Sequence, residues 1–117
     1  MREALRHVLF YESGDLSLAA EHFPAHKARY TEFMDRGVLL ALGPFADRRG
    51  SMAVFTTHEA AMEFASGDPF VEHGVVSGWE IREWRVVAPD HQVLCDLLAS
   101  VPRPAGRLRV EVDPVRA

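Results

Sequence analysis

The chain has 117 residues, of which 48% are hydrophobic and 26% are charged, and its net charge is −4. These values are typical of one globular domain that buries its own core, and they lack the basic excess expected of a nucleic-acid-binding protein. One cysteine, Cys95, excludes an internal disulfide, and the N-terminal residues lack the apolar core of a signal peptide. No apolar run approaches the roughly 20 residues that cross a bilayer, so we expect a cytoplasmic protein without membrane association.

The chain begins with a strand and a helix. Residues 4–11 alternate, so that one strand face would carry Leu5, His7, Leu9 and Tyr11, and the other Arg6, Val8 and Phe10. Residues 17–36 predict a helix capped by Ser17 and ended by Gly37, in which Pro24 introduces a kink or begins a second helix. An apolar stripe on this helix consists of Phe23, His26, Tyr30 and Phe33. The charged residues lie on the other side: Lys27, Arg29, Glu32, Asp35 and Arg36.

Three further strands are expected. Residues 38–45 are continuously apolar, which predicts a strand buried on both faces. Residues 51–56 return as its partner after a loop at 47–50. Residues 75–87 predict a long final strand, and the odd spacing of its two tryptophans places them on opposite faces: Trp79 and Trp84.

A second helix separates the hairpin from the last strand. Thr56 and Glu59 fit a capping box, with Thr56 as the N-cap of a helix over residues 59–66. Gly67 is expected to end this helix by taking a positive φ.

The C-terminal part of the chain has a different character. Residues 90–101 predict an apolar-faced helix, 102–106 a linker and 107–113 a strand with strict alternation. We therefore divide the chain into a domain over residues 1–88 and an extension over residues 89–117.

The order of the expected elements defines the fold. A β-α-β-β-α-β succession is the ferredoxin-like plan of the α+β class, with a four-stranded antiparallel sheet and both helices on one face. The strands are apolar on both faces, whereas a sheet face open to water would alternate. The simplest cover for the second face is the same sheet of another copy, which predicts a homodimer of the dimeric α+β barrel type.

Asp68 is the acid whose direction the local backbone fixes most firmly. Gly67 precedes it, and Pro69 keeps it out of the helical region. Two interpretations remain open at this point. Asp68 is the N-cap of a short helix that begins at Pro69, or it is an acid held in a defined direction for catalysis.

His26 has two interpretations as well. On the apolar stripe it is either a satisfied core residue or the acid–base group of a pocket, for which a histidine is well suited near neutral pH. In the second case Asp68 would hold one ring nitrogen and fix the tautomer. A serine hydrolase is disfavoured, because Ser51 and Ser77 lack a nucleophile elbow.

A metal site is the weaker alternative. His22 and His26 have the spacing of two ligands on one helix face, with His7 or His73 as a third ligand. Pro24 lies between the first two, and no motif supplies the third. We therefore expect neither a metal nor another cofactor.

Five short pieces, taken together, resemble the YciI-like (YCII) family over about residues 4–87. They are Phe23-Pro24-Ala25-His26, residues 37–44, Gly50-Ser51, Asp68-Pro69-Phe70 and residues 81–84. The resemblance implies a fold similar to that of muconolactone isomerases, which are dimeric α+β barrels with a sheet-lined cavity. It also implies an active-site pair at His26 and Asp68, and isomerisation or elimination, such as dehydrochlorination, of ring-derived compounds. One departure is Phe23, where the family often has an arginine able to bind an anionic group.

Two functional hypotheses follow. In the first, the chain is a small cofactor-independent enzyme with His26 as general base or acid and Asp68 as its orienting residue. The substrate would contact His7, Ser51, Phe23, Tyr30 and Phe70. In the second, it is a non-catalytic dimeric module that binds a small molecule or a partner, and His26 is structural.

Overall fold

The computed structural model describes residues 4–88. The helix expected at 90–101, the strand expected at 107–113 and Cys95 lie outside the described residues, as does the extension over 89–117 to which they belong.

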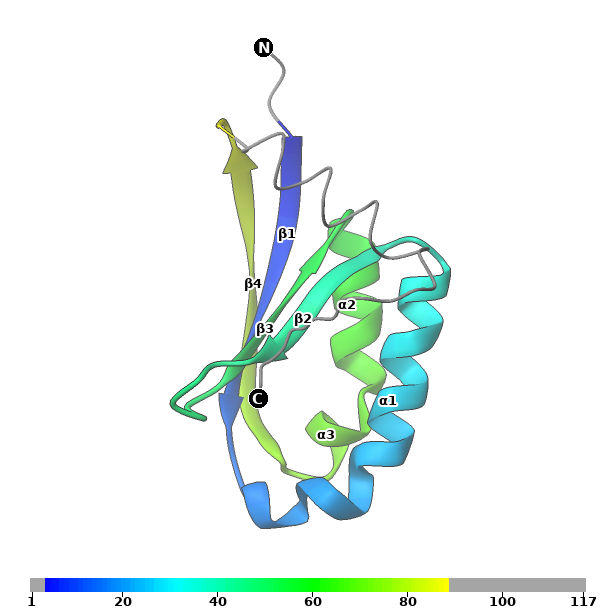
Figure 1. Ribbon diagram of the computed structural model, residues 1–117, viewed down its shortest axis with the longest axis vertical. Coiled ribbons are helices and arrows are strands. Elements are labelled where there is room, and N and C mark those ends of the chain that lie inside the picture. The colour runs from blue at the N-terminus through cyan, green and yellow to red at the C-terminus, as the bar shows by residue number, and fades with distance from the viewer. Residues whose placement is uncertain (1–3, 89–117) are drawn as a thin grey trace, which may run out of the picture. The chain divides into compact units, whose positions relative to one another are not determined.

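The described residues form a four-stranded antiparallel sheet with helices on one face (Figure 1). The strands are β1 (Ala4–Ser13), β2 (Leu39–Pro44), β3 (Ser51–Phe55) and β4 (Val76–Val86), adjacent in the order β2-β3-β1-β4. The helices are a 3-10 turn η1 (Leu16–Leu18), α1 (Ala19–Asp35), α2 (His58–Gly67) and a short α3 (Pro69–Glu72). The predicted α+β class and antiparallel sheet are therefore confirmed, and α3 is the short helix that the capping interpretation of Asp68 predicted at Pro69.

Helix α1 is continuous. Pro24 lies inside it, so the expectation of a second helix beginning at Pro24 is wrong. The cap at Ser17 is wrong too, because Asp15 caps η1 by accepting hydrogen bonds from the Ser17 amide at 3.0 Å and its hydroxyl at 2.6 Å. The predicted end of the helix is confirmed. Gly37 has a φ of 80°, its amide donates to Met34 O, and the next amide donates to Phe33 O, which closes a Schellman motif.

Helix α2 begins and ends differently from the prediction. Its N-cap is Thr57, whose hydroxyl accepts from the Ala60 amide at 3.1 Å, so the capping box at Thr56 and Glu59 is not formed. Gly67 is the last helical residue, and the positive φ values belong to other residues. A Cβ at position 67 would lie 2.6 Å from Arg29 Nη2, so a larger residue there would displace the guanidinium.

The core lies between the sheet and the helices. Phe33, Phe55 and Phe64 are at most 1% exposed, and their rings meet at centroid distances of 5.2 to 6.4 Å. Arg29 was expected on the solvent side, but it lies between α1 and α2. Its guanidinium carbon is 5.1 Å from the centre of the Phe33 ring, and its nitrogens donate to Phe64 O at 3.1 Å and Glu63 O at 2.6 Å.

The sheet face away from the helices carries apolar side chains. Strand register places Phe10 opposite Met52, and Trp84 opposite Arg6, on this face, whereas Trp79 lies opposite Tyr11 on the helix side. The predicted opposite orientation of the two tryptophans is thus confirmed. Trp84 is 48% exposed and Met52 36%.

Strand β2 was expected to be buried on both faces, and within the described residues it is not. It is the edge strand of the sheet, and its register shifts between Leu39 and Ala41. Leu39 is 3% exposed, but Leu40, at the irregularity, is 45% exposed. Among residues 4–88, no helix combines the length and the apolar character needed to cross a bilayer.

Candidate active site

Asp68 lies in the junction between α2 and α3. Its extended backbone (φ −71°, ψ 125°) ends α2 and starts α3, with Pro69 in the first turn. Its Oδ1 atom accepts a hydrogen bond from the Phe70 amide at 3.1 Å, so the predicted capping role is real. The side chain is fully buried. A buried carboxylate requires further donors, because an unpaired charge in the interior is strongly unfavourable.

His26 supplies one of these donors from α1. Its Nδ1 atom lies 2.8 Å from Asp68 Oδ1, and the two side chains are 9% and 0% exposed. An ionised carboxylate only accepts hydrogen bonds, so this contact assigns the proton to Nδ1 and leaves Nε2 as the basic nitrogen of the neutral ring. Capping α3 and holding His26 therefore do not exclude each other, since one carboxylate does both.

Tyr11 supplies the third donor, a role that was not predicted from the sequence. Tyr11 lies on β1, an inner strand of the sheet, and its hydroxyl donates a hydrogen bond of 2.6 Å to Asp68 Oδ2. Burial and the adjacent Asp68 carboxylate raise the pKa of Tyr11 above its ordinary value of 10.0, so the phenol keeps its proton. The sequence did contain a signal for this role. Tyr11 shares a strand face with Leu9, and a hydroxyl buried on that face requires a hydrogen-bond partner.

Aromatic rings enclose the imidazole. Phe70 stacks on His26 with the ring centres 3.9 Å apart and the planes at 6°. Tyr30 meets the ring edge on at 5.3 Å, and Phe23 lies 6.2 Å away with 43% of its surface exposed. The three aromatic residues predicted to contact a substrate therefore surround His26, and Phe23 is the most exposed of them.

The two polar residues predicted to contact a substrate lie at different distances from this group. Ser51 pairs with Tyr11 across β3 and β1, which places its side chain on the same face of the sheet as that of Tyr11. His7 is four residues from Tyr11 along β1, about 13 Å at strand spacing. Its ring meets His58 at 6.1 Å, so the structure does not bring His7 to the pair.

The histidines considered as metal ligands are not arranged as their spacing in the sequence suggested. His22 stacks on His73, with centres 3.9 Å apart and planes at 4°. Parallel rings direct their nitrogen lone pairs along parallel lines, which does not converge on one ion. No group of three or more potential metal ligands occurs within residues 4–88.

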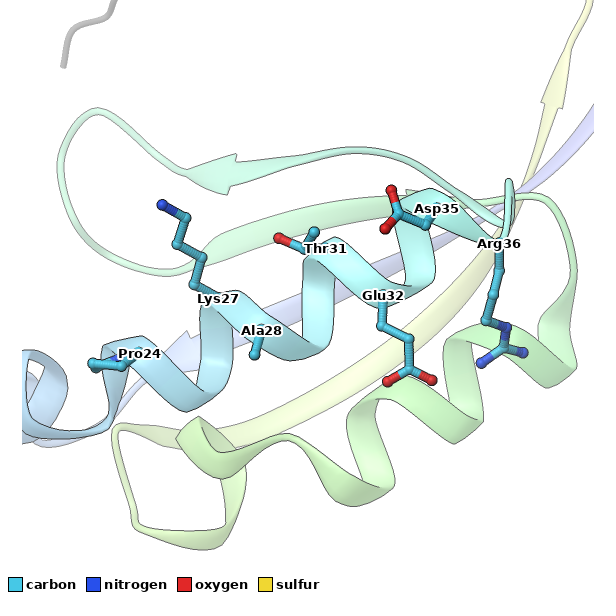
Figure 2. Close-up of a pocket in the computed structure, with 7 residues that line it drawn as sticks. All are labelled: Pro24, Lys27, Ala28, Thr31, Glu32, Asp35 and Arg36. Carbon is cyan, nitrogen blue, oxygen red and sulfur yellow. The ribbon is translucent and has the colours of Figure 1, made fainter.

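A surface hollow runs along the outer side of α1 (Figure 2). It is lined by Pro24, Lys27, Ala28, Thr31, Glu32, Asp35 and Arg36. Figure 2 shows charged side chains of both signs on this side of the helix. None of the lining residues belongs to the group around His26, so we place the candidate site at the buried pair and not in this hollow.

A solved structure is similar in fold to this chain. It is 5-chloro-2-hydroxyhydroquinone dehydrochlorinase from Burkholderia phenoliruptrix AC1100, in complex with 2,5-dihydroxybenzoquinone. The TM-score is 0.57 at 17% sequence identity, and the match covers 74% of this chain and 97% of the other. No curated protein sequence matches this chain. Residues 6–85 match the YCII-related domain, and the chain therefore belongs to this family.

Proposed function

We propose that this chain is a small enzyme in which His26 moves a proton on a small organic substrate. The observation that supports it is the buried array in which Asp68 accepts from His26 at 2.8 Å and from Tyr11 at 2.6 Å. A carboxylate held in this way orients the imidazole, fixes its tautomer and stabilises the imidazolium that forms when Nε2 takes up a proton. A structural histidine at this position would also need a hydrogen-bond partner, so turnover is the property that separates the two roles.

The reaction class is a proton-transfer isomerisation or an elimination. Nε2 of His26 takes a proton from a carbon or hydroxyl of the substrate, and the released electron pair forms a new double bond. In an isomerisation the imidazolium returns the proton at another carbon. In an elimination a halide leaves with its bonding electrons, and the proton passes to solvent. These steps need a base and its orienting acid, and no cofactor.

The surroundings of His26 favour a planar, ring-derived substrate. Phe23, Tyr30 and Phe70 present aromatic surface around the imidazole, which suits stacking with an unsaturated ring. Arg29, on the same helix, is bound to backbone carbonyl oxygens of α2. A neutral ring is therefore a better fit than a carboxylate. The fold similarity to a dehydrochlorinase of a chlorinated hydroxyhydroquinone agrees with this class. Ser51, opposite Tyr11 on β3, would add a polar contact.

We also propose that the enzyme is a homodimer that packs sheet against sheet, as in dimeric α+β barrels. Phe10, Met52 and Trp84 share the face away from the helices, and a second copy of this face would cover them. Light scattering after size exclusion should give twice the mass of 13.1 kDa, and Trp84→Glu should shift the protein to monomer. A monomeric wild-type protein at 100 μM or so would contradict this assembly.

The test of the enzyme proposal uses chemically defined probes. We would follow chloride release from 5-chloro-2-hydroxyhydroquinone and isomerisation of a muconolactone, with wild type, His26→Asn and Asp68→Asn. Loss of the general base should lower turnover by about 10²–10⁴-fold. His58→Asn is the matched control, because His58 is an exposed histidine at the start of α2 with its ring against His7.

Two outcomes would contradict the proposal. One is turnover in His26→Asn equal to that of wild type. The other is a wild-type protein that binds the probes saturably without turning them over, together with a His26→Asn protein that binds them equally well and has a lower melting temperature. This result would favour the non-catalytic binding module.

A further inference from the structure

We propose that Tyr11 is a positioning residue, whose hydrogen bond to Oδ2 of Asp68 weakens the attraction of that carboxylate for a proton on Nε2 of His26. The consequence for turnover rests on the function proposed above, whereas the consequence for the imidazole proton stands without it.

The two oxygens of Asp68 are satisfied unequally. Oδ1 accepts from the Phe70 amide at 3.1 Å and lies 2.8 Å from Nδ1 of His26. Oδ2 accepts one hydrogen bond within residues 4–88, which comes from the Tyr11 hydroxyl at 2.6 Å. Because the carboxylate is 0% exposed, bulk water does not replace a lost donor. The phenol is thus the group that stabilises the charge on the oxygen opposite His26.

The proton balance of the pair follows from this bond. With one proton, the pair has an ionised Asp68 and a neutral ring that carries its hydrogen on Nδ1. With a second proton, Nε2 is protonated and the base is blocked. A donor to the carboxylate stabilises the ionised Asp68 and makes it a weaker attractor for an additional proton. Removing the Tyr11 hydroxyl should therefore raise the affinity of the pair for the second proton.

The other polar groups around the pair do not replace Tyr11. From α1, the Tyr30 ring meets His26 edge on at 5.3 Å, and Arg29 is bound to the carbonyl oxygens of Glu63 and Phe64. The charge of Arg29 lowers the pKa of Tyr11, whereas burial and Asp68 raise it, and the effect of Arg29 is the smallest of the three. Helix α2 contributes the ring of Phe64, which carries no charge.

The rest of the fold holds the phenol in place. Tyr11 is on β1, a central strand of the sheet, with Ser51 opposite it on β3 and Trp79 opposite it on β4. The side chain is 8% exposed. The Tyr11 donor therefore comes from the sheet, and the two other hydrogen-bond donors to Asp68 come from helices. The array thus connects the sheet to the helical layer.

The first experiment measures the imidazole directly and needs no substrate. Full-length protein labelled with ¹⁵N-histidine gives two-bond ¹⁵N–¹H spectra, and His26→Gln identifies the signals of His26 among the six histidines. In wild type we expect the tautomer with hydrogen on Nδ1. In Tyr11→Phe the titration midpoint of these signals should rise by about one pH unit, a tenfold increase in proton affinity, as expected for one lost hydrogen bond to a charged group.

Tyr30→Phe is the matched control, because it removes the other tyrosine hydroxyl next to the same ring and leaves Asp68 with its three donors. Its His26 midpoint should stay within about 0.2 pH units of wild type. Equal midpoints in wild type and Tyr11→Phe would overturn the proposal.

A second variant covers the case in which Tyr11→Phe does not fold. In the Tyr30→Phe background, 3-fluorotyrosine occupies position 11 alone and donates a stronger hydrogen bond because its phenol is more acidic. The midpoint of His26 should then fall relative to the same background with ordinary tyrosine. An unchanged or raised midpoint would count against the proposal.

The activity measurement separates this inference from the proposed function. If a probe is turned over, the acidic limb of the kcat/KM profile in Tyr11→Phe should move upward in pH by the same amount as the NMR midpoint, with KM nearly unchanged. If no probe is turned over but the NMR midpoint moves, the proposed function fails and the role of Tyr11 in the proton balance stands.

Discussion

Two carboxylates connect α1 to the segment that follows β3, in opposite surroundings. Glu63 receives two hydrogen bonds from Arg36, at 3.0 and 3.1 Å, and the side chains are 54% and 40% exposed. Asp68 lies at a similar distance from His26, but it is fully buried. The Arg36 hydrogen bond lowers the pKa of Glu63, as expected of a charge-assisted contact. Water replaces Arg36 when that pair opens, whereas nothing replaces the donors of Asp68. Burial, and not contact geometry, therefore ranks the two pairs.

The largest difference should appear when Asp68 itself is removed. Asp68→Ala leaves His26, the Tyr11 hydroxyl and the Phe70 amide without their acceptor, and we expect the free energy of unfolding to fall by about 3–5 kcal/mol. Urea denaturation measures this change. The control is Asp15→Ala, which removes an exposed capping aspartate from η1 and should cost about 1 kcal/mol. Similar losses in the two variants would contradict the ranking by burial.

Alkaline pH should weaken the buried array through Tyr11. Its pKa is raised in the folded protein, so the unfolded chain loses this proton first as pH rises. The stabilising contribution is therefore complete below pH 10 or so and decreases by about 1.4 kcal/mol per pH unit above it. Unfolding curves between pH 9 and 11, compared with Tyr11→Phe, isolate this effect. A parallel pH dependence in the two proteins would show that the phenol is not the source.

A contact of intermediate burial makes the comparison sharper. Gly67→Ala would place a Cβ 2.6 Å from Arg29 Nη2, displacing a guanidinium that donates to two carbonyl oxygens of α2. Alanine is the better helix former, so the two effects oppose each other, and we expect a net loss of about 1 kcal/mol. In an Arg29→Ala background the same change should become stabilising. Thermal unfolding of the four proteins in this cycle gives the coupling, and a sign that does not reverse would contradict it.

The exposed pair should show the smallest effect. Arg36→Ala is expected to lower the melting temperature by at most about 2 °C, because an exposed ion pair contributes little. In 1 M salt the difference from wild type should disappear, since such salt screens exposed charges within about 3 Å. A salt-independent loss would point to the packing of Arg36 on the Phe33 ring, 4.4 Å away, as the source.

The sequence was sufficient where a local pattern and the fold agree. Alternation along residues 4–11 placed Leu9 and Tyr11 on one face, and the register confirms that face as the one toward the helices. The apolar stripe placed His26 inward, and the Asp-Pro dipeptide placed Asp68 at a helix start. Residue type and backbone preference determine these features within a few positions of the chain.

The remaining features depend on contacts between distant segments. Tyr11 and Asp68 are 57 residues apart, so no spacing rule connects them. Arg29 falls on the charged side of a helical wheel, yet it is partly buried because its guanidinium binds carbonyl oxygens of α2. Gly67 was predicted to take a positive φ, but the structure shows instead a close approach of the Arg29 guanidinium to this position. In each case the missing information was which other segment packs there.

The shared use of Asp68 has an evolutionary consequence. Because the same carboxylate starts α3 and anchors a histidine, selection for folding alone retains it, whether or not any substrate is present. Substitutions at residues around that imidazole, such as Phe23, would therefore change the surroundings of the base while the acid stays in place.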